Sequence, residues 1–158
     1  MRRLVAAVGI LTALPGCAAE RSCTLVGAPA GISIRVDAPL AGRVSAAELT
    51  ACWDGSCRRT RVELHPAGGI VRQSCEGTDC TAELGPKGGK QGFGDLAELP
   101  KARVDAVLRL EGRAGATVVE RRLTVTPKAV FPNGPDCGEA GPQAVITVSG
   151  TGSASEGT

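Results

Sequence analysis

Two six-residue segments that begin and end in cysteine constrain this chain of 158 residues more than any other feature. They are Cys52–Cys57 and Cys75–Cys80. The first contains Asp54-Gly55, a strong two-residue hairpin turn, because a type I′ turn needs positive φ at both central residues. The second contains Gly77-Thr78, which suits a type II′ turn with glycine first. Such turns place the two cysteines opposite each other in a non-hydrogen-bonded pair, about 4.5 Å apart at Cα. Each hairpin is therefore expected to close a disulfide.

The register of the first hairpin predicts the face that carries its disulfide. Glu48 meets Arg61 on the same face as Cys52–Cys57, which is a favourable opposite-charge pair. The other face collects apolar side chains and Trp53. We therefore expect the disulfide on the solvent side and Trp53 on the core side.

The same argument gives the opposite result for the second hairpin. Its register again makes a favourable pair, Arg72 with Glu83. The disulfide face, however, also carries Val71, Ala82 and Leu84. The Cys75–Cys80 disulfide is therefore expected to be buried.

The N-terminus has the parts of an export signal. Arg2 and Arg3 precede an apolar stretch, Leu4–Leu14, that is too short to cross a bilayer of roughly 30 Å. The stretch ends in Leu-Pro-Gly-Cys at residues 14–17, which resembles the bacterial lipobox of a Leu, a variable residue, a small residue and Cys. The resemblance implies that residues 1–16 are a lipoprotein signal peptide. It also implies that Cys17 receives a diacylglycerol thioether and becomes the mature N-terminus.

A lipid on Cys17 would place the protein at the extracytoplasmic face of a bacterial cell membrane, with the bilayer as its partner. Two acyl chains give durable attachment, whereas one is reversible. Residues 17–22 would then form a short tether. The alternative is ordinary cleavage near Ala18-Ala19, which would release a soluble secreted protein.

The cysteine count agrees with lipidation. There are seven cysteines, and six remain if Cys17 carries lipid, which is an even number for an oxidising compartment. With both hairpins closed, Cys23 and Cys137 remain and are expected to pair, which ties the two ends of the domain together. Zinc is the rival for these sulfurs, because zinc knuckles use cysteines two to four residues apart. Export and hairpin geometry favour disulfides.

Net charge and aromatic content exclude several kinds of partner. The chain has 18 basic and 16 acidic side chains. Loss of a signal peptide with Arg2 and Arg3 would make the two numbers equal, so no basic footprint for nucleic acid remains. Aromatic residues are only 2% of the chain, which leaves little material for stacking on sugars or bases.

Alternating apolar and polar residues predict about seven or eight short strands and no long helix. The expected strands are residues 31–37, 47–53, 58–64, 70–75, 80–84, 102–111, 117–126 and 143–148. Arg121 falls in phase with core residues, so a β-bulge near Glu120-Arg121 is expected. Gly85–Gly94 and Pro127–Pro142 are expected to be loops, and residues 149–158 a disordered tail. Residues 23–148 should form an all-β, antiparallel β-sandwich, immunoglobulin-like or transthyretin-like.

The chain resembles small uncharacterised actinobacterial lipoproteins. The resemblance lies in the lipobox at Cys17, in the preference for Arg over Lys, and in the Cys52–Cys57 hairpin. It implies a location at the cell surface and says nothing about activity.

Few residues offer chemistry. Gly92–Ala97 matches the loose dinucleotide fingerprint, but it lacks the preceding strand and following helix that the motif requires, so a plain loop is expected. His65 is the single histidine; without a nucleophile elbow it is expected to be a surface residue. Lys87 and Lys90 lie among glycines and predict a mobile cationic loop, which could contact an anionic cell-wall polymer. No catalytic residue, metal or cofactor is expected.

Two functions fit these observations. The first is a cell-surface, lipid-anchored binding or structural module of unknown ligand that is not an enzyme. The alternative is a secreted, disulfide-braced inhibitor of an extracellular hydrolase, because rigid loops bind with little entropic cost. Its reactive element would be Gly85–Gly94 or Pro127–Pro142. A hydrolase, the third hypothesis, would need a cleft that holds His65 or a close pair of carboxyl groups.

Overall fold

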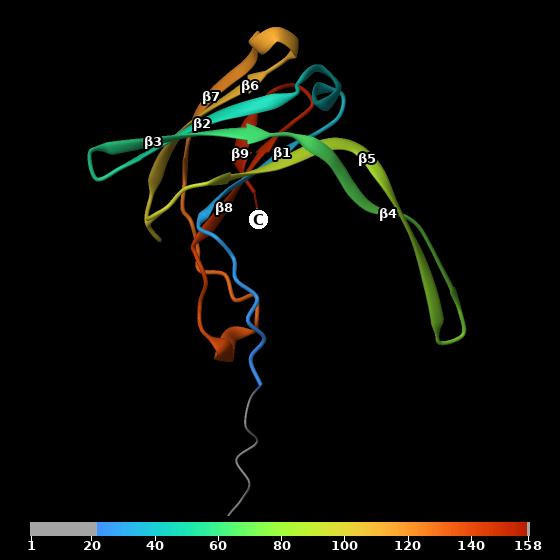
Figure 1. Ribbon diagram of the computed structural model, residues 1–158. Coiled ribbons are helices and arrows are strands. Elements are labelled where there is room, and N and C mark those ends of the chain that lie inside the picture. Colours follow the sequence, from blue (N-terminus) through green and yellow to red (C-terminus); the bar gives the residue numbers. More distant parts are fainter. Residues whose placement is uncertain (1–21, 158) are drawn as a thin grey trace, which may run out of the picture.

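The computed structural model describes residues 22–157, which form a sandwich-like body of two β-sheets (Figure 1). Within this range there is no α-helix, and three short 3₁₀ turns are the helical elements. The strands are β1 (Gly31–Val36), β2 (Ala46–Trp53), β3 (Ser56–Glu63), β4 (His65–Glu76), β5 (Asp79–Asp95), β6 (Val104–Glu111), β7 (Thr117–Val125), β8 (Gln143–Val148) and β9 (Ala154–Glu156). The prediction of an all-β chain with two packed sheets is confirmed.

The two sheets differ in how their strands pair. The first has the order β4-β5-β1-β8-β9 and the second the order β3-β2-β6-β7. All pairs are antiparallel except β1 with β8, which run parallel with Ile34 opposite Ile146. The expectation of a purely antiparallel sandwich is wrong at this pair. It joins strands from the two ends of the domain, and local sequence patterns carry no information on such a pairing.

The core lies between the sheets and is built from the alternating apolar residues of both. Ile34, Leu49 and Leu108 are among its fully buried side chains. Leu40 and Leu99, from the connections after β1 and before β6, seal it. Burial of such side chains contributes about 1.5–3 kcal/mol each, which makes the body the stable unit of the chain.

The first hairpin has the predicted geometry. Asp54 and Gly55 both have positive φ, at 47° and 72°, as a type I′ turn requires. Cys52 lies opposite Cys57, and the two form a disulfide with a Cα–Cα distance of 4.1 Å. Trp53 packs against the core from a half-buried position. Beyond the hairpin tip, the solvent face of this sheet is charged and internally paired, as Glu120 and Arg109 show at 3.1 Å.

The second hairpin does not pack on the body. β4 and β5 continue past the sheet as a long two-stranded ribbon, which we call the arm (residues 68–86; Figure 1). Its turn has positive φ at Gly77, and Cys75 and Cys80 form the expected disulfide opposite each other. Both cysteines are exposed, so the predicted burial of this disulfide is wrong. The apolar side chains beside it are not covered by any described part of the chain.

Gly85–Gly94, expected to be a loop, is part of the continuous strand β5. Glycine is usually unfavourable in a strand, but it permits close approach of another backbone. Gly92 lies against β3, where an added Cβ would sit 2.4 Å from the carbonyl oxygen of Glu63. The glycines therefore let β5 cross from the first sheet over the edge of the second.

The β-bulge of β7 lies at another place than expected. Leu110 pairs with Val119 and Glu111 with Thr117, so the additional residue is Val118 rather than Glu120 or Arg121. Arg121 stays opposite Leu108, in phase with the core face, but its side chain is exposed at the sheet edge. A long cationic side chain can leave an edge strand in this way without a change of register.

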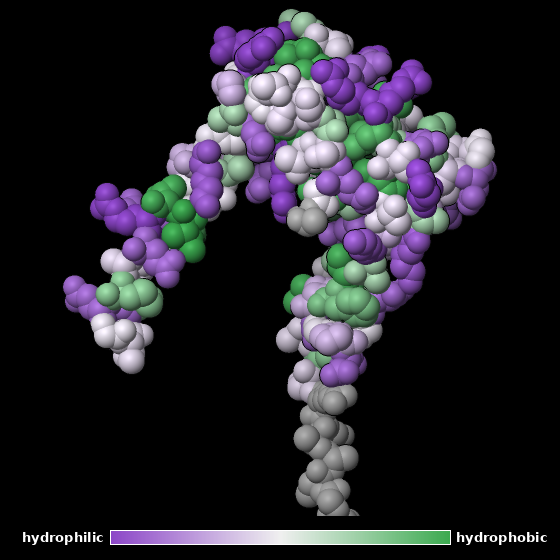
Figure 2. Space-filling view, turned by 180° about the vertical axis from the view of Figure 1, so that it is seen from behind, coloured by the Kyte–Doolittle hydropathy of each residue, from purple (hydrophilic) through white to green (hydrophobic). Residues whose placement is uncertain are grey.

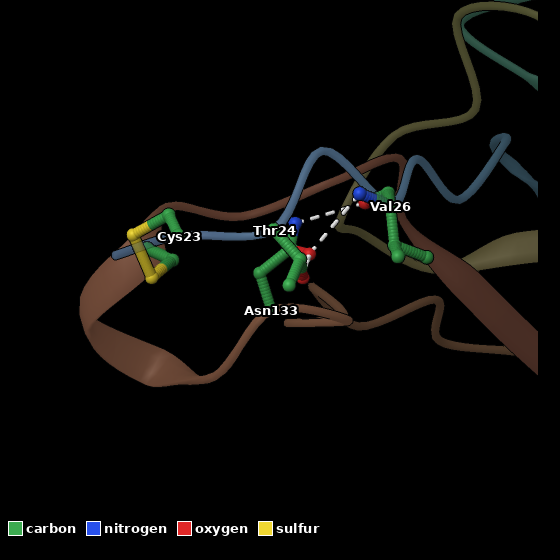
Figure 3. The surroundings of a disulfide bond; sticks show 5 residues. Cys23, Thr24, Val26 and Asn133 are labelled. Carbon is green, nitrogen blue, oxygen red and sulfur yellow. Dashed lines mark hydrogen bonds between the residues drawn. A yellow bond between two sulfur atoms is a disulfide. The ribbon is translucent and has the colours of Figure 1, made fainter. Parts of the chain in front are cut away.

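The two ends of the domain form a narrow extension below the body, which we call the stalk (residues 22–30 and 129–141; Figure 1). The predicted disulfide between Cys23 and Cys137 closes its far end. Asn133 bonds to the backbone of Val26 on both sides: its Oδ1 accepts from the N–H at 3.1 Å, and its Nδ2 donates to the C=O at 2.9 Å (Figure 3). The stalk is thus an extended segment cross-linked to an irregular one, which carries the 3₁₀ turn Pro135–Cys137.

The C-terminal segment is ordered as far as residue 157. β9 pairs with β8 through Thr147 and Ser155, and the N–H of Gly157 donates to the C=O of Val145. The disordered tail expected for residues 149–158 is wrong over this range. Small polar residues suit an edge strand as well as a tail, so the sequence did not distinguish them.

No helix in the described part of the chain is long and apolar enough to cross a membrane. The signal peptide predicted for residues 1–16 and the lipid site at Cys17 lie outside the described residues.

Candidate functional site

The arm exposes three large apolar side chains to solvent. Lys90–Asp95 of β5 pair with β1, whereas the residues of β5 before Lys90 pair with β4 alone. Ile70, Val71 and Leu84 expose 47%, 50% and 76% of their surface, although buried positions are the usual place for such residues. Figure 2 shows green, hydrophobic atoms on the projecting ribbon, apart from the body. The arm therefore offers apolar surface that no described segment covers.

Local geometry explains where the apolar side chains of the arm lie. Ile70 is paired with Leu84, and the next pair is Arg72 with Glu83, so Val71 is a bulged residue. Gly85 leaves room for Val71, whose methyl groups are 3.1 Å from where a Cβ of residue 85 would be. The bulge increases the twist of the ribbon and turns it away from the sheet. Val71 thus lies beside Gly85, next to the Ile70–Leu84 pair near the base of the arm.

The rest of the arm is polar and braced. Ser74 and Thr81 lie opposite each other with their hydroxyl oxygens 2.9 Å apart. Arg72 and Glu83 form a loose ion pair at 3.9 Å. Two-stranded ribbons are marginally stable in water, and the Cys75–Cys80 disulfide at the tip offsets this weakness. The disulfide and these pairings brace the arm as an extended ribbon.

A second feature is a shallow hollow of about 330 Å³ on the outer face of the first sheet. Its lining includes Ser33 and Arg35 of β1, His65 of β4, and Gln91 and Phe93 of β5. Arg35 lies opposite Gln91, and Gln91 opposite His65, in one row across three strands. The hollow is open to solvent and joins one aromatic ring to several hydrogen-bonding groups.

His65 is exposed, as the sequence predicted, with 72% of its side-chain surface accessible. Its Nε2 is 3.9 Å from a carboxylate oxygen of Glu63. Ser33, the nearest hydroxyl in the hollow by strand order, is two strands away, which is roughly 10 Å or more at the usual strand spacing. A hydroxyl at that distance cannot be activated by His65, because the two groups must come within hydrogen-bond reach.

Lys87 and Lys90, expected on a mobile cationic loop, lie on β5. The Nζ of Lys90 donates a hydrogen bond to the carbonyl oxygen of Val44. The side chain of Lys87 lies across Gly69, close enough that a Cβ there would meet its Cε at 2.5 Å. The expectation of a mobile loop is therefore wrong, and one of its two cations is fixed to the body.

The Gly-Phe-Gly sequence that resembled a dinucleotide fingerprint has a structural explanation. It lies inside β5, and no helix follows. A Cβ on Gly94 would be 3.0–3.2 Å from Thr60, Val62 and Leu49. These glycines permit packing of the two sheets and do not form a turn around a phosphate.

Glu111 is the one buried charged residue among residues 22–157, and no sequence pattern predicted its burial. Arg61 of β3 reaches its carboxylate at 2.9 Å. The contact is an ion pair without hydrogen-bond alignment, because Oε2 of Glu111 has no hydrogen-bond partner. Removal of one partner of such a pair leaves an uncompensated charge, so we assign the pair a structural role in joining β3 to β6.

All six cysteines of the described range are in disulfides. No group of three or more His, Cys, Asp and Glu side chains within residues 22–157 is arranged to hold a metal ion. No family model matches the chain, and no curated protein or solved structure is significantly similar to it.

Proposed function

We propose that this chain is a lipid-anchored binding module on the extracytoplasmic face of a bacterial membrane, and that the arm is its binding element. The lipobox-like sequence ending at Cys17 supports the anchor. Three disulfides support an oxidising compartment. The proposal assigns the protein no catalytic role, and the sandwich itself is proposed to be immunoglobulin-like or transthyretin-like.

The observation that carries the proposal is the exposed apolar surface of the arm. A monomer gains nothing from keeping Ile70, Val71 and Leu84 in water on an extended ribbon. Apolar patches of this kind mark interaction sites, and free strand edges pair readily with another strand. A protein partner that covers the apolar side chains and pairs with the free strand edge would stabilise the arm and bind tightly to it.

The position of the stalk fits a membrane anchor. The described chain begins at Ser22, and only residues 18–22 separate Cys17 from the disulfide at Cys23. Arm and stalk extend from the body in the same general direction (Figure 2). An anchor at Cys17 would therefore hold the arm near the membrane surface, where other anchored proteins are its most accessible partners.

Processing of the precursor tests the anchor. Globomycin, which blocks cleavage of lipoprotein signal peptides, is expected to accumulate the uncleaved chain. The mature chain should partition into detergent, whereas a Cys17→Ser variant should not. Indifference of the wild-type chain to the drug would contradict lipidation and favour ordinary cleavage near Ala18-Ala19.

Removal of the apolar surface tests the arm. The detergent-extracted lipoprotein is expected to sediment as a complex larger than one chain. The double substitution Ile70→Ser and Leu84→Ser should reduce this mass to that of one chain. Because both residues are exposed, folding should change by no more than about 0.5 kcal/mol per substitution.

A matched control uses two exposed apolar residues outside the arm. Leu25→Ser with Val26→Ser alters the stalk and should leave the sedimenting mass unchanged. A wild-type protein that sediments as one chain would contradict a binding role for the arm. If both double variants reduced the sedimenting mass equally, general surface polarity, and not the arm, would control association.

The alternative, an inhibitor of an extracellular hydrolase, has one structural observation in its favour. The Pro127–Pro142 segment is irregular, is cross-linked at Cys137 and exposes Phe131. The other proposed reactive element, Gly85–Gly94, is a strand and not a loop. Stoichiometric inhibition of extracellular proteases by the purified chain would favour this alternative.

A further inference from the structure

The outer edge of β4 has free backbone groups in a defined register. The Cα atoms of Cys75 and Cys80 are 4.1 Å apart, as in a non-hydrogen-bonded pair, where about 4.5 Å is usual. Since bonded and non-bonded pairs alternate along a ribbon, Gln73 is in a non-bonded pair as well. The N–H and C=O groups of Gln73 and Cys75 therefore point away from β5, toward solvent.

From this edge, and on the basis of the function proposed above, we propose that the partner of the arm is a second copy of this chain. The two β4 strands would pair antiparallel about a two-fold axis at Ser74. Gln73 of each copy would then lie opposite Cys75 of the other, so that their free backbone groups bond to each other. The two ribbons would form one four-stranded sheet.

Charge complementarity supports this register. An axis at Ser74 places Arg72 opposite Glu76 of the second copy, and the reverse, which gives two ion pairs per dimer. Within one chain Glu76 is opposite Asp79, an unfavourable like-charge pair with no cation assigned to it. The second copy would supply that cation, while Arg72 keeps Glu83 on its other side.

The other edge of the arm is not self-complementary. On β5, an axis at Glu83 would place two glutamates opposite each other. An axis at Thr81 would place Asp79 opposite Glu83, again with equal charges. An axis at Ala82 would form no ion pair, and Pro86 removes a backbone donor near the base of the arm. The self-pairing is therefore assigned to β4.

Anchoring favours such a dimer. Two copies in one membrane are confined to a thin layer, which raises their effective concentration. The two-fold axis makes the interface isologous, so the assembly closes at two chains and does not grow into a fibre. The apolar residues Ile70 and Leu84 would lie on one face of the four-stranded sheet, beside the same residues of the partner chain.

Charge exchange tests the register. In the detergent-extracted full chain, Arg72→Glu and Glu76→Arg should each weaken dimer formation by about tenfold, because each creates two like-charge pairs. The double variant, with both substitutions, should restore dimerisation to near the wild-type level. Failure of the double variant to recover would overturn the Ser74-centred register.

Disulfide trapping identifies the partner. Ser74→Cys should give a covalent dimer of twice the chain mass in membranes, since the two side chains meet in a non-bonded pair with suitable Cα separation. Thr81→Cys is the matched control: it removes the same Ser74–Thr81 hydrogen bond but lies on the other edge. Peptide mapping of both variants should show Cys75–Cys80 intact.

The outcomes separate this inference from the function on which it rests. A covalent dimer with Ser74→Cys alone supports the second copy as partner. Equal dimerisation through Thr81→Cys contradicts it. A covalent adduct of another mass, together with a wild-type complex that sediments as more than one chain, overturns the self-pairing but leaves the arm as a binding element. A wild-type chain that sediments alone overturns both.

Discussion

Joint replacement of Cys23 and Cys137 by serine is expected to lower the free energy of unfolding by about 5 kcal/mol. The two cysteines are 114 residues apart, so their disulfide restricts the unfolded chain more than either hairpin disulfide does. Substitution of both avoids a free thiol that could exchange with the other disulfides. Urea or guanidinium unfolding under oxidising conditions measures the loss.

The hairpin disulfide of the arm is the control for this prediction. Cys75 and Cys80 are 5 residues apart, and their joint replacement by serine should cost only about 2 kcal/mol. Because both disulfides are distant from the core, neither substitution creates a cavity. If the two double variants lost the same free energy of unfolding, the stalk would unfold independently of the body. Its cross-link would then not stabilise the sandwich.

Gly92→Ala is expected to destabilise the body by about 3 kcal/mol, at the upper end of the range for overpacking. The added methyl group would be 2.4 Å from the backbone oxygen of Glu63 and 2.6 Å from Val62. A backbone oxygen cannot rotate away as a side chain can, so β5 would have to move off β3. Thermal and denaturant unfolding would measure the change.

Gly68→Ala provides the matched control in the neighbouring strand. No atom lies within 4 Å of the position where its Cβ would be. The same change there should be neutral or stabilise the protein by up to about 1 kcal/mol, because alanine reduces the freedom of the unfolded chain. A similar loss at both positions would mean that glycine is needed in these strands for backbone conformation and not for close approach.

The parts of the fold that depend on local chemistry could be predicted from the sequence. Asp54 and Gly55 determine a turn, and that turn determines the register from Trp53–Ser56 outward to Ala46–Glu63. The same reasoning gave the pairing of Arg72 with Glu83 in the second hairpin. Disulfide partners followed from these registers, because each turn leaves its cysteines opposite each other.

The exposure of the arm could not be predicted, because alternation shows that a face is apolar but not what covers it. Val71 and Leu84 have the composition of a core face, and the sequence contains no signal that the body ends before them. Similarly, Gly85–Gly94 has loop composition, but close packing on β3 is the reason for its glycines. Long-range packing, and not local preference, decided both cases.

In the candidate site, too, features set by local sequence could be predicted and features set by long-range packing could not. The sequence identified His65 as a surface residue and identified Cys75 and Cys80 as partners. It did not identify the arm, because the exposed apolar surface there arises from the absence of a neighbouring element in the described chain. The Arg61–Glu111 pair was missed because the two residues are 50 positions apart in the numbering, on strands separated by β2.

The parallel pair of β1 and β8 has a consequence for how the chain acquires its structure. β1 is central in its sheet, yet one of its neighbours consists of residues 143–148. During synthesis or export from the N-terminus, the pairing of β1 with β8 cannot be completed until residue 148 has emerged. Non-local contacts of this kind slow folding and prolong the exposure of unpaired strands. We therefore expect the first sheet to form late, only after β8 has emerged, with β1 in need of chaperone protection until then.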